Sequence, residues 1–134
     1  MKIAVAVAVI MDNQQRFLIT QRPTHVPHGG CWEFPGGKLE ENETSEFALI
    51  REVKEEVDLD VHQYQLLGEV NHQYSDKAVT LIVFLVTHFS GEPSCKENQL
   101  DMKWVSLQEL NPKDFPAANQ DIITMLYHHP KFSS

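Results

Sequence analysis

One stretch of the sequence, GGKLEENETSEFALIREVKEEVDL at positions 36–59, limits what the chain can fold into more than any other segment. It begins with a Gly-Gly pair and continues with helical periodicity, which predicts a helix from about Thr44 to Val57, capped by Thr44 or Asn42. On a helical wheel three carboxylates gather within an arc of about 100°, at Glu52, Glu55 and Glu56. We expect the opposite face to pack on a sheet through its apolar side chains, Phe47, Ile50, Val53 and Val57.

This group of acids conflicts with the preferences of an isolated helix. Like charges three and four residues apart repel by roughly a few tenths of a kcal/mol per pair, and acids near the C-terminal end oppose the helix macrodipole. One interpretation is a solvated face, whose repulsion Arg51 and Lys54 reduce. The other is a metal site, because clustered carboxylates suit Mg²⁺ or Mn²⁺. The spacing alone leaves both interpretations open, although such conflicts tend to mark functional sites.

The other hydrophobic segments predict strands on both sides of this helix. Strands are expected at 3–10, 16–21, 62–70, 77–89 and 102–105, and a second amphipathic helix at about 118–128. The first two strands are expected to form a hairpin, and the nearly all-apolar segment 80–86 to lie inside the sheet. Gly36-Gly37 and Ser75-Asp76 are expected to be turns. This order predicts an α/β (α+β) fold in which one mixed, curved sheet is flanked by two helices, an α/β/α sandwich.

Length and charge exclude some classes of protein. The chain of 134 residues is expected to form one domain, residues 1–134. A formal net charge of −8 argues against a groove for DNA or RNA and against an anionic membrane surface. A small anionic ligand stays possible, because a bound divalent cation can invert the local field. Two cysteines, Cys31 and Cys95, are expected to be reduced thiols. We therefore expect a cytoplasmic protein, and a monomer because no apolar patch is evident.

The spacing of the charged residues in the opening stretch resembles the signature of the Nudix hydrolase family. That pattern is G-x5-E-x7-R-E-U-x-E-E-x-G-U, where U is bulky and apolar. Eight of its nine specified positions are filled, beginning at Gly37 and ending at Leu59. The departure is Asp58, where the pattern has Gly. A Gly there suits a left-handed helix terminator, and Asp tolerates that conformation better than most residues do. The resemblance favours the metal interpretation.

The resemblance implies a Nudix-type sandwich that uses Mg²⁺, or Mn²⁺ in its place, to hydrolyse a nucleoside diphosphate linked to a further group. Carried over to this chain, the metal ligands are the Gly36 carbonyl and the carboxylates of Glu52, Glu56 and Glu97. The implied catalytic residues are Arg51, Glu52, Glu55 and Glu97. Gly37 and Glu43 are implied to be structural in the motif. Whether Glu55 or Glu97 is the general base is left open, and phosphoryl transfer needs no covalent nucleophile.

Segments outside the signature resemble the MutT-type members of the family, the 8-oxo-dGTP diphosphatases. They include FLITQRP at 17–23, WEFPGGKLE at 32–40 and LNPKDFPAAN at 110–119. The implied reaction converts 8-oxo-dGTP to 8-oxo-dGMP and pyrophosphate by water attack at the β-phosphorus, which sanitises the nucleotide pool and prevents replication errors. One alternative is another nucleotide substrate, such as dCTP, ADP-ribose or a dinucleoside polyphosphate. A second is a non-catalytic nucleotide-sensing domain, against which the intact carboxylates argue.

The same resemblance implies a set of substrate-binding residues. The Asn119 side-chain amide would bond the base, although Asn also suits the N-cap of the last helix. The Phe34 carbonyl would accept the N7–H that 8-oxoguanine has and guanine lacks. Arg22 and Lys77 would contact phosphate. The wall of the base pocket would come from Tyr74 and from the first strand, at Ile3 and Val5.

Overall fold

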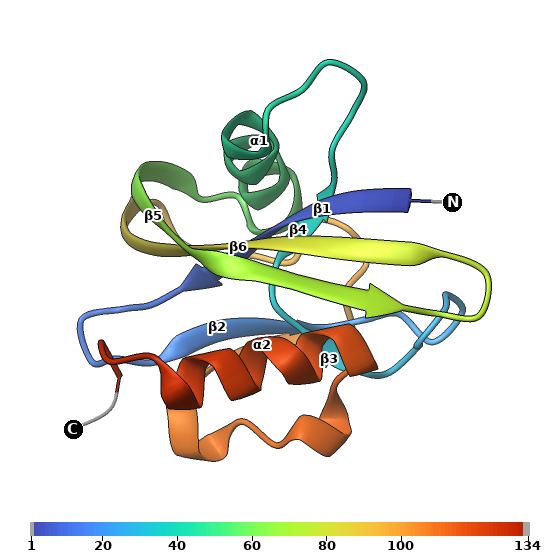
Figure 1. Ribbon diagram of the computed structural model, residues 1–134. Coiled ribbons are helices and arrows are strands. Elements are labelled where there is room, and N and C mark those ends of the chain that lie inside the picture. Colours follow the sequence, from blue (N-terminus) through green and yellow to red (C-terminus); the bar gives the residue numbers. More distant parts are fainter. Residues whose placement is uncertain (1, 133–134) are drawn as a thin grey trace.

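The computed structural model describes residues 2–132 and contains two helices and seven strands among them. Figure 1 follows the chain through these elements. In chain order they are β1 (Lys2–Ile10), β2 (Phe17–Gln21), β3 (Trp32–Glu33), β4 (Gly36–Lys38), α1 (Ser45–Val57), β5 (Asp60–Gln73), β6 (Ala78–Ser90), β7 (Asp101–Val105) and α2 (Ala117–His128). Two single 3₁₀ turns, Leu107–Glu109 and Pro112–Asp114, connect β7 to α2. The predicted α/β (α+β) fold class with two helices is confirmed.

The strands form two sheets rather than the single sheet predicted. A mixed sheet has the order β4-β1-β6-β5, in which β1 and β6 are parallel, and an antiparallel sheet has the order β3-β2-β7. The segment 80–86 lies in β6, an interior strand, as predicted. The predicted hairpin of the first two strands is wrong. Only Met11 and Phe17 form a bridge, because the chain turns at Asp12 and β2 then pairs with β7.

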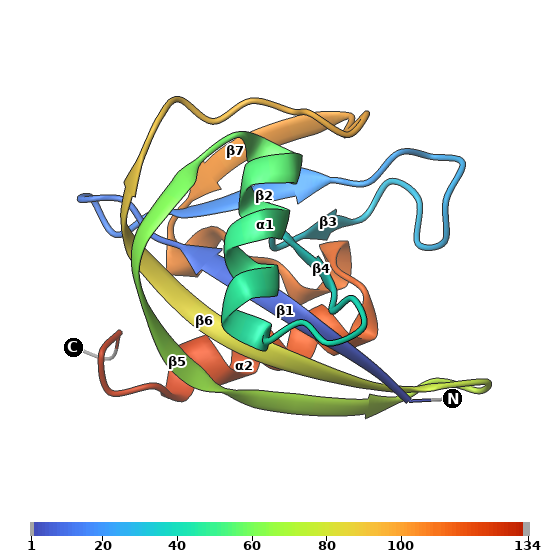
Figure 2. The same cartoon turned by 90° about the horizontal axis from the view of Figure 1, so that it is seen from above.

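Strand β1 separates two hydrophobic cores by its alternation of side chains. Val7 and Val9 face the core that contains α2, while Ala6, Ala8 and Ile10 face the core that contains α1. Successive side chains of a strand point to opposite faces, so each core takes every second residue. Figure 1 accordingly shows α1 and α2 on opposite faces of the mixed sheet. The small alanine side chains let α1 lie close over β1 and β4, as Figure 2 shows from above.

Helix α1 begins and ends as its sequence predicts but is turned about its axis. The Thr44 hydroxyl accepts a hydrogen bond from the Phe47 N–H at 3.1 Å, and Asp58 ends the helix in the left-handed conformation, with φ 61° and ψ 37°. The prediction that Phe47 and Ile50 pack on the sheet is wrong, since they are 65% and 40% exposed. The buried side chains are Ala48, Leu49, Val53 and Val57. The buried face is thus rotated by roughly a quarter of a turn towards Glu56.

The Gly36-Gly37 pair belongs to β4 and is not the turn predicted. Gly36 pairs with Val7 and Gly37 with Ala6, antiparallel to β1. A Cβ atom at Gly36 would lie 2.2 Å from the Ala6 carbonyl oxygen, so only glycine allows this approach. The predicted reversal at Ser75-Asp76 is present between β5 and β6. Among residues 2–132 no helix is long and apolar enough to cross a membrane.

Candidate functional site

Three carboxylates converge where the C-terminal half of α1 meets the loop between β6 and β7. They are Glu52 and Glu56 of α1 and Glu97 of the loop, and one oxygen atom of each lies within 4.8 Å of the others. All three were predicted metal ligands, and the structure brings them together. Hard oxygen ligands at this spacing fit Mg²⁺ or Mn²⁺, which take carboxylate oxygens and keep further positions for water and phosphate.

The loop that carries Glu97 is bonded to the last turn of α1. The Glu56 carbonyl accepts hydrogen bonds from the Lys96 N–H at 3.0 Å and from the Gln99 Nε2 at 2.9 Å. The Gln99 Oε1 in turn accepts from the Glu97 N–H at 2.8 Å. Gln99 thus fixes the backbone of Glu97 relative to the helix. Sequence reasoning missed Gln99, because a polar loop residue carries no periodic signal.

Burial and mutual repulsion disfavour the charged forms of the two helix carboxylates. Desolvation by burial raises the pKa of Glu56 well above its ordinary value, and the charges of Glu33, Glu52 and Glu97 raise it further. Burial also raises the pKa of Glu52. The Gly36 N–H, which donates to the Glu56 Oε2 at 2.9 Å, acts in the opposite direction. A divalent cation would reverse this balance by attracting the charged forms, so the residues fit such an ion.

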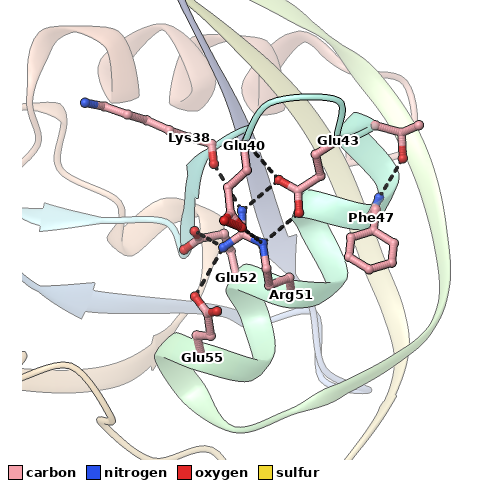
Figure 3. Close-up of polar contacts among 8 residues, drawn as sticks. Lys38, Glu40, Glu43, Phe47, Arg51, Glu52 and Glu55 are labelled. Carbon is pink, nitrogen blue, oxygen red and sulfur yellow. Dashed lines mark hydrogen bonds and ion pairs between the residues drawn. The ribbon is translucent and has the colours of Figure 1, made fainter.

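Arg51 links the loop after β4 to the metal-site carboxylates, as Figure 3 shows. Its Nε and Nη2 donate to the two oxygens of Glu43 at 2.7 and 2.8 Å, a bidentate pair. Its Nη1 donates to the Glu52 Oε1 at 2.7 Å, and its Nη2 to the Lys38 carbonyl at 3.1 Å. The bond from Arg51 is the main cause that lowers the pKa of Glu43 to about 2. The structure therefore brings Glu43, Arg51 and Glu52 into one chain of ion pairs, with Glu43 as the brace.

Glu55 lies outside the cluster of three carboxylates. Its side chain is 48% exposed and contacts the Arg51 Nη1 at 3.2 Å. Glu97, the other candidate for the general base, belongs to the cluster. Which of the two is the general base stays a prediction.

A cavity of about 290 Å³ gathers three of the four predicted substrate-binding residues, while Phe34 is not part of its lining. Its lining includes Arg22, Lys77 and Asn119, which come from three separate parts of the chain. The three predicted wall residues, Ile3, Val5 and Tyr74, line it as well. Lys38, which sequence reasoning missed, also lines the cavity, and Figure 3 shows its side chain directed away from the carboxylates around Arg51.

Glu33 connects this cavity to the carboxylates and was also missed. Its Oε1 accepts from the Arg22 Nη1 at 2.9 Å, while the Arg22 Nε donates to the Pro27 carbonyl at 2.8 Å. Burial raises the pKa of Glu33, whose charge also acts on Glu56. Alternation along Trp32–Phe34 could have found it, because the buried Phe34 side chain places its neighbour Glu33 on the opposite face.

Asn119 and Phe34 are in direct contact. Asn119 is the third residue of α2 and follows Pro116 at the N-cap, so the alternative prediction that Asn119 caps the helix is wrong. Its Oδ1 accepts a hydrogen bond from the Phe34 N–H at 3.3 Å. Phe34 is 3% exposed, and its ring stacks on Phe115 with the centroids 5.7 Å apart. The predicted base-binding pair is therefore held by the core.

Known proteins resemble the chain in both sequence and structure. The family model described as "NUDIX domain" matches residues 6–125. An 8-oxo-dGTP diphosphatase of Proteus vulgaris is 50% identical over 91 residues, which cover 68% of this chain and 81% of that protein. Another from Escherichia coli is 38% identical over 125 residues, 93% of this chain and 96% of that one.

A solved structure extends the similarity to the fold. The MutT NUDIX hydrolase of Burkholderia pseudomallei superposes with a TM-score of 0.85 at 28% identity and covers 94% of this chain and 98% of that one. The resemblance to MutT-type enzymes and the prediction of a pyrophosphohydrolase are thereby confirmed. From the family match over residues 6–125 and from these relatives, we conclude that the chain belongs to the Nudix hydrolase family.

Proposed function

We propose that the protein hydrolyses 8-oxo-dGTP to 8-oxo-dGMP and pyrophosphate in a reaction that depends on Mg²⁺, with Mn²⁺ as a substitute. One observation carries the proposal: the cavity lined by Asn119, Arg22 and Lys77 is linked to the cluster of Glu52, Glu56 and Glu97. Lys38 lines the cavity, and its carbonyl accepts from Arg51, which also bonds Glu52. A nucleotide whose base occupies the cavity would have its phosphates near the carboxylates. The relatives named 8-oxo-dGTP diphosphatase support the same substrate.

Asn119 and Phe34 would recognise the oxidised base. The Asn119 Oδ1 is engaged by the Phe34 N–H, which leaves the Nδ2 hydrogens to donate to an acceptor on the base. The Phe34 carbonyl would accept the N7–H of 8-oxoguanine. In guanine this carbonyl would face the N7 lone pair, and an unpaired buried acceptor costs about 1–3 kcal/mol.

The charged residues would position the triphosphate and the attacking water. Arg22, oriented by Glu33, and Lys77 would bind phosphate oxygens. Glu52 and Glu56 would hold Mg²⁺ together with Glu97 and the Gly36 carbonyl. When bound, Mg²⁺ neutralises phosphate charge and makes water a better nucleophile. Glu97 would accept the proton of the water, while Arg51 keeps Glu52 in place.

Steady-state kinetics test the substrate. With Mg²⁺ present we expect kcat/KM for 8-oxo-dGTP to exceed that for dGTP, dCTP and ADP-ribose by at least about a hundredfold, corresponding to roughly 3 kcal/mol of discrimination. Comparable values for 8-oxo-dGTP and dGTP would refute the proposal. Glu52→Gln should abolish turnover and leave the fold intact, whereas retained activity would contradict the metal assignment. Turnover by the unaltered protein would itself exclude the alternative of a non-catalytic nucleotide sensor.

Isotope labelling tests the position of attack. In H₂¹⁸O, attack at the β-phosphorus places the label in pyrophosphate, whereas attack at the α-phosphorus places it in 8-oxo-dGMP. We expect the label in pyrophosphate, as measured by mass spectrometry of both products. A single-turnover reaction excludes later exchange.

The proposed role is removal of oxidised nucleotides before a polymerase incorporates them, in the cytoplasm and as a monomer. Such a role needs no direct contact with DNA or RNA, which agrees with the formal net charge of −8. Sedimentation equilibrium over a range of protein concentrations would test the monomer, and a concentration-dependent rise in mass would exclude it.

A further inference from the structure

The first turn of α2 lacks a local N-terminal cap. The residue at the cap position is Pro116, whose side chain accepts no hydrogen bond, although an N-terminal turn leaves several N–H groups without partners. Ala118 is 4% exposed, so its N–H is shielded from water. A buried N–H group needs an acceptor, and this one finds it far away in the sequence.

That acceptor is the hydroxyl of Tyr74, which lies in the turn between β5 and β6. The Ala118 N–H donates to the Tyr74 Oη at 3.3 Å across 44 residues of sequence. The turn that carries Tyr74 is itself tied down. The Tyr74 N–H donates to the Lys77 carbonyl at 2.8 Å, and the Gln73 amide donates to the carbonyls of Tyr74 and Lys77 at 2.7 and 3.0 Å.

The Tyr74 ring has its own packing partners and faces the cavity. His72 makes an edge contact with it, with the centroids 4.5 Å apart, and the Lys77 Nζ lies 5.8 Å from its centroid. The same ring lines the cavity beside Ala118 and Asn119. The hydroxyl that holds α2 thus belongs to a side chain whose own position is set by a second element.

We propose that Tyr74 is a positioning residue for base recognition: its hydroxyl caps α2 and so holds Asn119 in register with Phe34. Asn119 directly follows the capped Ala118 and contacts the Phe34 N–H at 3.3 Å, a long bond that a small displacement would break. This inference rests on the proposed function, because it concerns selectivity for the oxidised base.

The test compares Tyr74→Phe with Tyr127→Phe. Tyr74→Phe keeps the cavity wall and removes only the capping hydroxyl. Tyr127 lies in the same helix, and its hydroxyl donates to the Leu107 carbonyl at 3.0 Å, outside the cavity lining. Tyr127→Phe therefore removes a similar tether of α2 and controls for a loss of helix stability alone.

For Tyr74→Phe we expect KM for 8-oxo-dGTP to rise roughly fivefold, the effect of one hydrogen bond, with kcat changed less than twofold. KM for dGTP should change less, so the preference for the oxidised base falls. The dissociation constant of 8-oxo-dGMP, measured by calorimetry, should rise by the same factor as KM. In ligand-free protein, amide exchange at Ala118 should accelerate by about tenfold or more. Tyr127→Phe should leave KM for both nucleotides, the dissociation constant of 8-oxo-dGMP and amide exchange at Ala118 unchanged.

Two results would overturn the inference. Unchanged KM and unchanged exchange at Ala118 in Tyr74→Phe would show that the hydroxyl does not hold the helix. Equal rises of KM in both variants would reduce Tyr74 to a general structural role.

If the unaltered protein does not prefer 8-oxo-dGTP over dGTP, the proposed function fails first. The role of Tyr74 in selectivity then fails with it, whether or not amide exchange at Ala118 accelerates in Tyr74→Phe.

Discussion

Gly37 in β4 lies against the carboxylate of Glu52 in α1. A Cβ atom at position 37 would lie 2.3 Å from the Glu52 Cδ and 2.4 and 2.5 Å from its two oxygens. No real Cβ contact is that short, so the side chain of Glu52 occupies space that any larger residue at position 37 would take. The Gly-Gly pair therefore shapes the candidate metal site directly.

Gly37→Ala is expected to displace the Glu52 carboxylate by about 1 Å. A displacement of that size in a reacting assembly costs on the order of a hundredfold in kcat. The fold should persist, because the side chain that must move is long and partly exposed. The measurement is kcat with 8-oxo-dGTP, with circular dichroism to verify the fold.

Gly68→Ala is the matched control for this substitution. Its Cβ would meet only the flexible end of Met125, at 3.3 Å, away from the candidate site. Gly68 has φ 158°, so alanine there also adds backbone strain that Gly37 lacks, and kcat is compared per folded protein. We expect kcat to stay within about twofold of the unaltered protein. Full activity in Gly37→Ala would show that the position of Glu52 is not critical.

Removing the Glu56 carboxylate should stabilise the metal-free protein and abolish its response to Mg²⁺. The pKa of Glu56 is raised in the folded state, so its ionised form opposes folding at neutral pH, and stability is regained as pH falls through the folded pKa. Glu56→Gln removes that penalty. In the unaltered protein, Mg²⁺ at about 100 times its Kd should raise Tm by on the order of 10 °C.

Differential scanning calorimetry with Mg²⁺ and with a chelator distinguishes these states. Glu46→Gln, an exposed carboxylate in the first turn of α1, should retain the full response to Mg²⁺. A Glu56→Gln protein whose Tm still rises with Mg²⁺ as in the unaltered protein would contradict the assignment of this residue to the metal site.

The pair of Glu43 and Arg51 should stabilise the fold above about pH 4.5 and lose this effect in acid. Arg51 lowers the folded pKa of Glu43 from 4.5 to about 2, so ionised Glu43 favours the folded state. For a lowered pKa the contribution is complete above the unfolded value and disappears as pH falls towards the folded value. Glu43→Gln should therefore reduce the free energy of unfolding at pH 7 but not near pH 2.

Urea denaturation at several pH values measures this difference directly. The difference in free energy of unfolding between the unaltered protein and Glu43→Gln should shrink steadily from pH 5 downwards. Glu41→Gln removes an exposed carboxylate of the same loop and should leave the pH dependence as it is. If this difference in free energy of unfolding stays constant with pH, the ion pair is not its cause.

The sequence predicted the residues of the candidate site better than their surroundings. Helical spacing placed Glu52, Glu55 and Glu56 on one face, because neighbours at i, i+3 and i+4 share a face in any structure, and the resemblance to the Nudix signature then singled out Glu52 and Glu56 as ligands. Helical spacing misjudged which face of α1 is buried. A helical wheel counts apolar side chains as buried, whereas here Ile50 is exposed and the Glu56 carboxylate accepts a hydrogen bond from Gly36 of β4. A metal site reverses the usual sorting of polar from apolar side chains, and only the packed structure reveals it.

Contacts between distant segments were beyond sequence reasoning for a different physical reason. The bonds from Gln99 to the Glu56 carbonyl and from Ala118 to Tyr74 each join parts of the chain more than 40 residues apart. Such partners depend on sheet order and on how the helices lie over the sheet, and neither residue type demands a particular partner. The two-sheet arrangement escaped prediction likewise, since β2 finds its partner in β7, far along the chain.

Position 58, the one departure from the Nudix signature, gives a last prediction. Asp58 has φ 61°, and its N–H donates to the Lys54 carbonyl. Glycine adopts this conformation without strain, whereas Asp58→Gly also removes the surface ion pair with Lys54. We expect the relief of strain to outweigh the lost ion pair, so that the free energy of unfolding rises by a net value of about 0.5 kcal/mol. Asp58→Ala keeps a Cβ without a polar side chain and should lower it by about 1 kcal/mol. Neither change should alter KM, because Asp58 lies outside the cavity lining and the carboxylate cluster. Denaturant titrations of both variants decide the matter: a stabilising Asp58→Ala would show that the left-handed conformation carries no strain here.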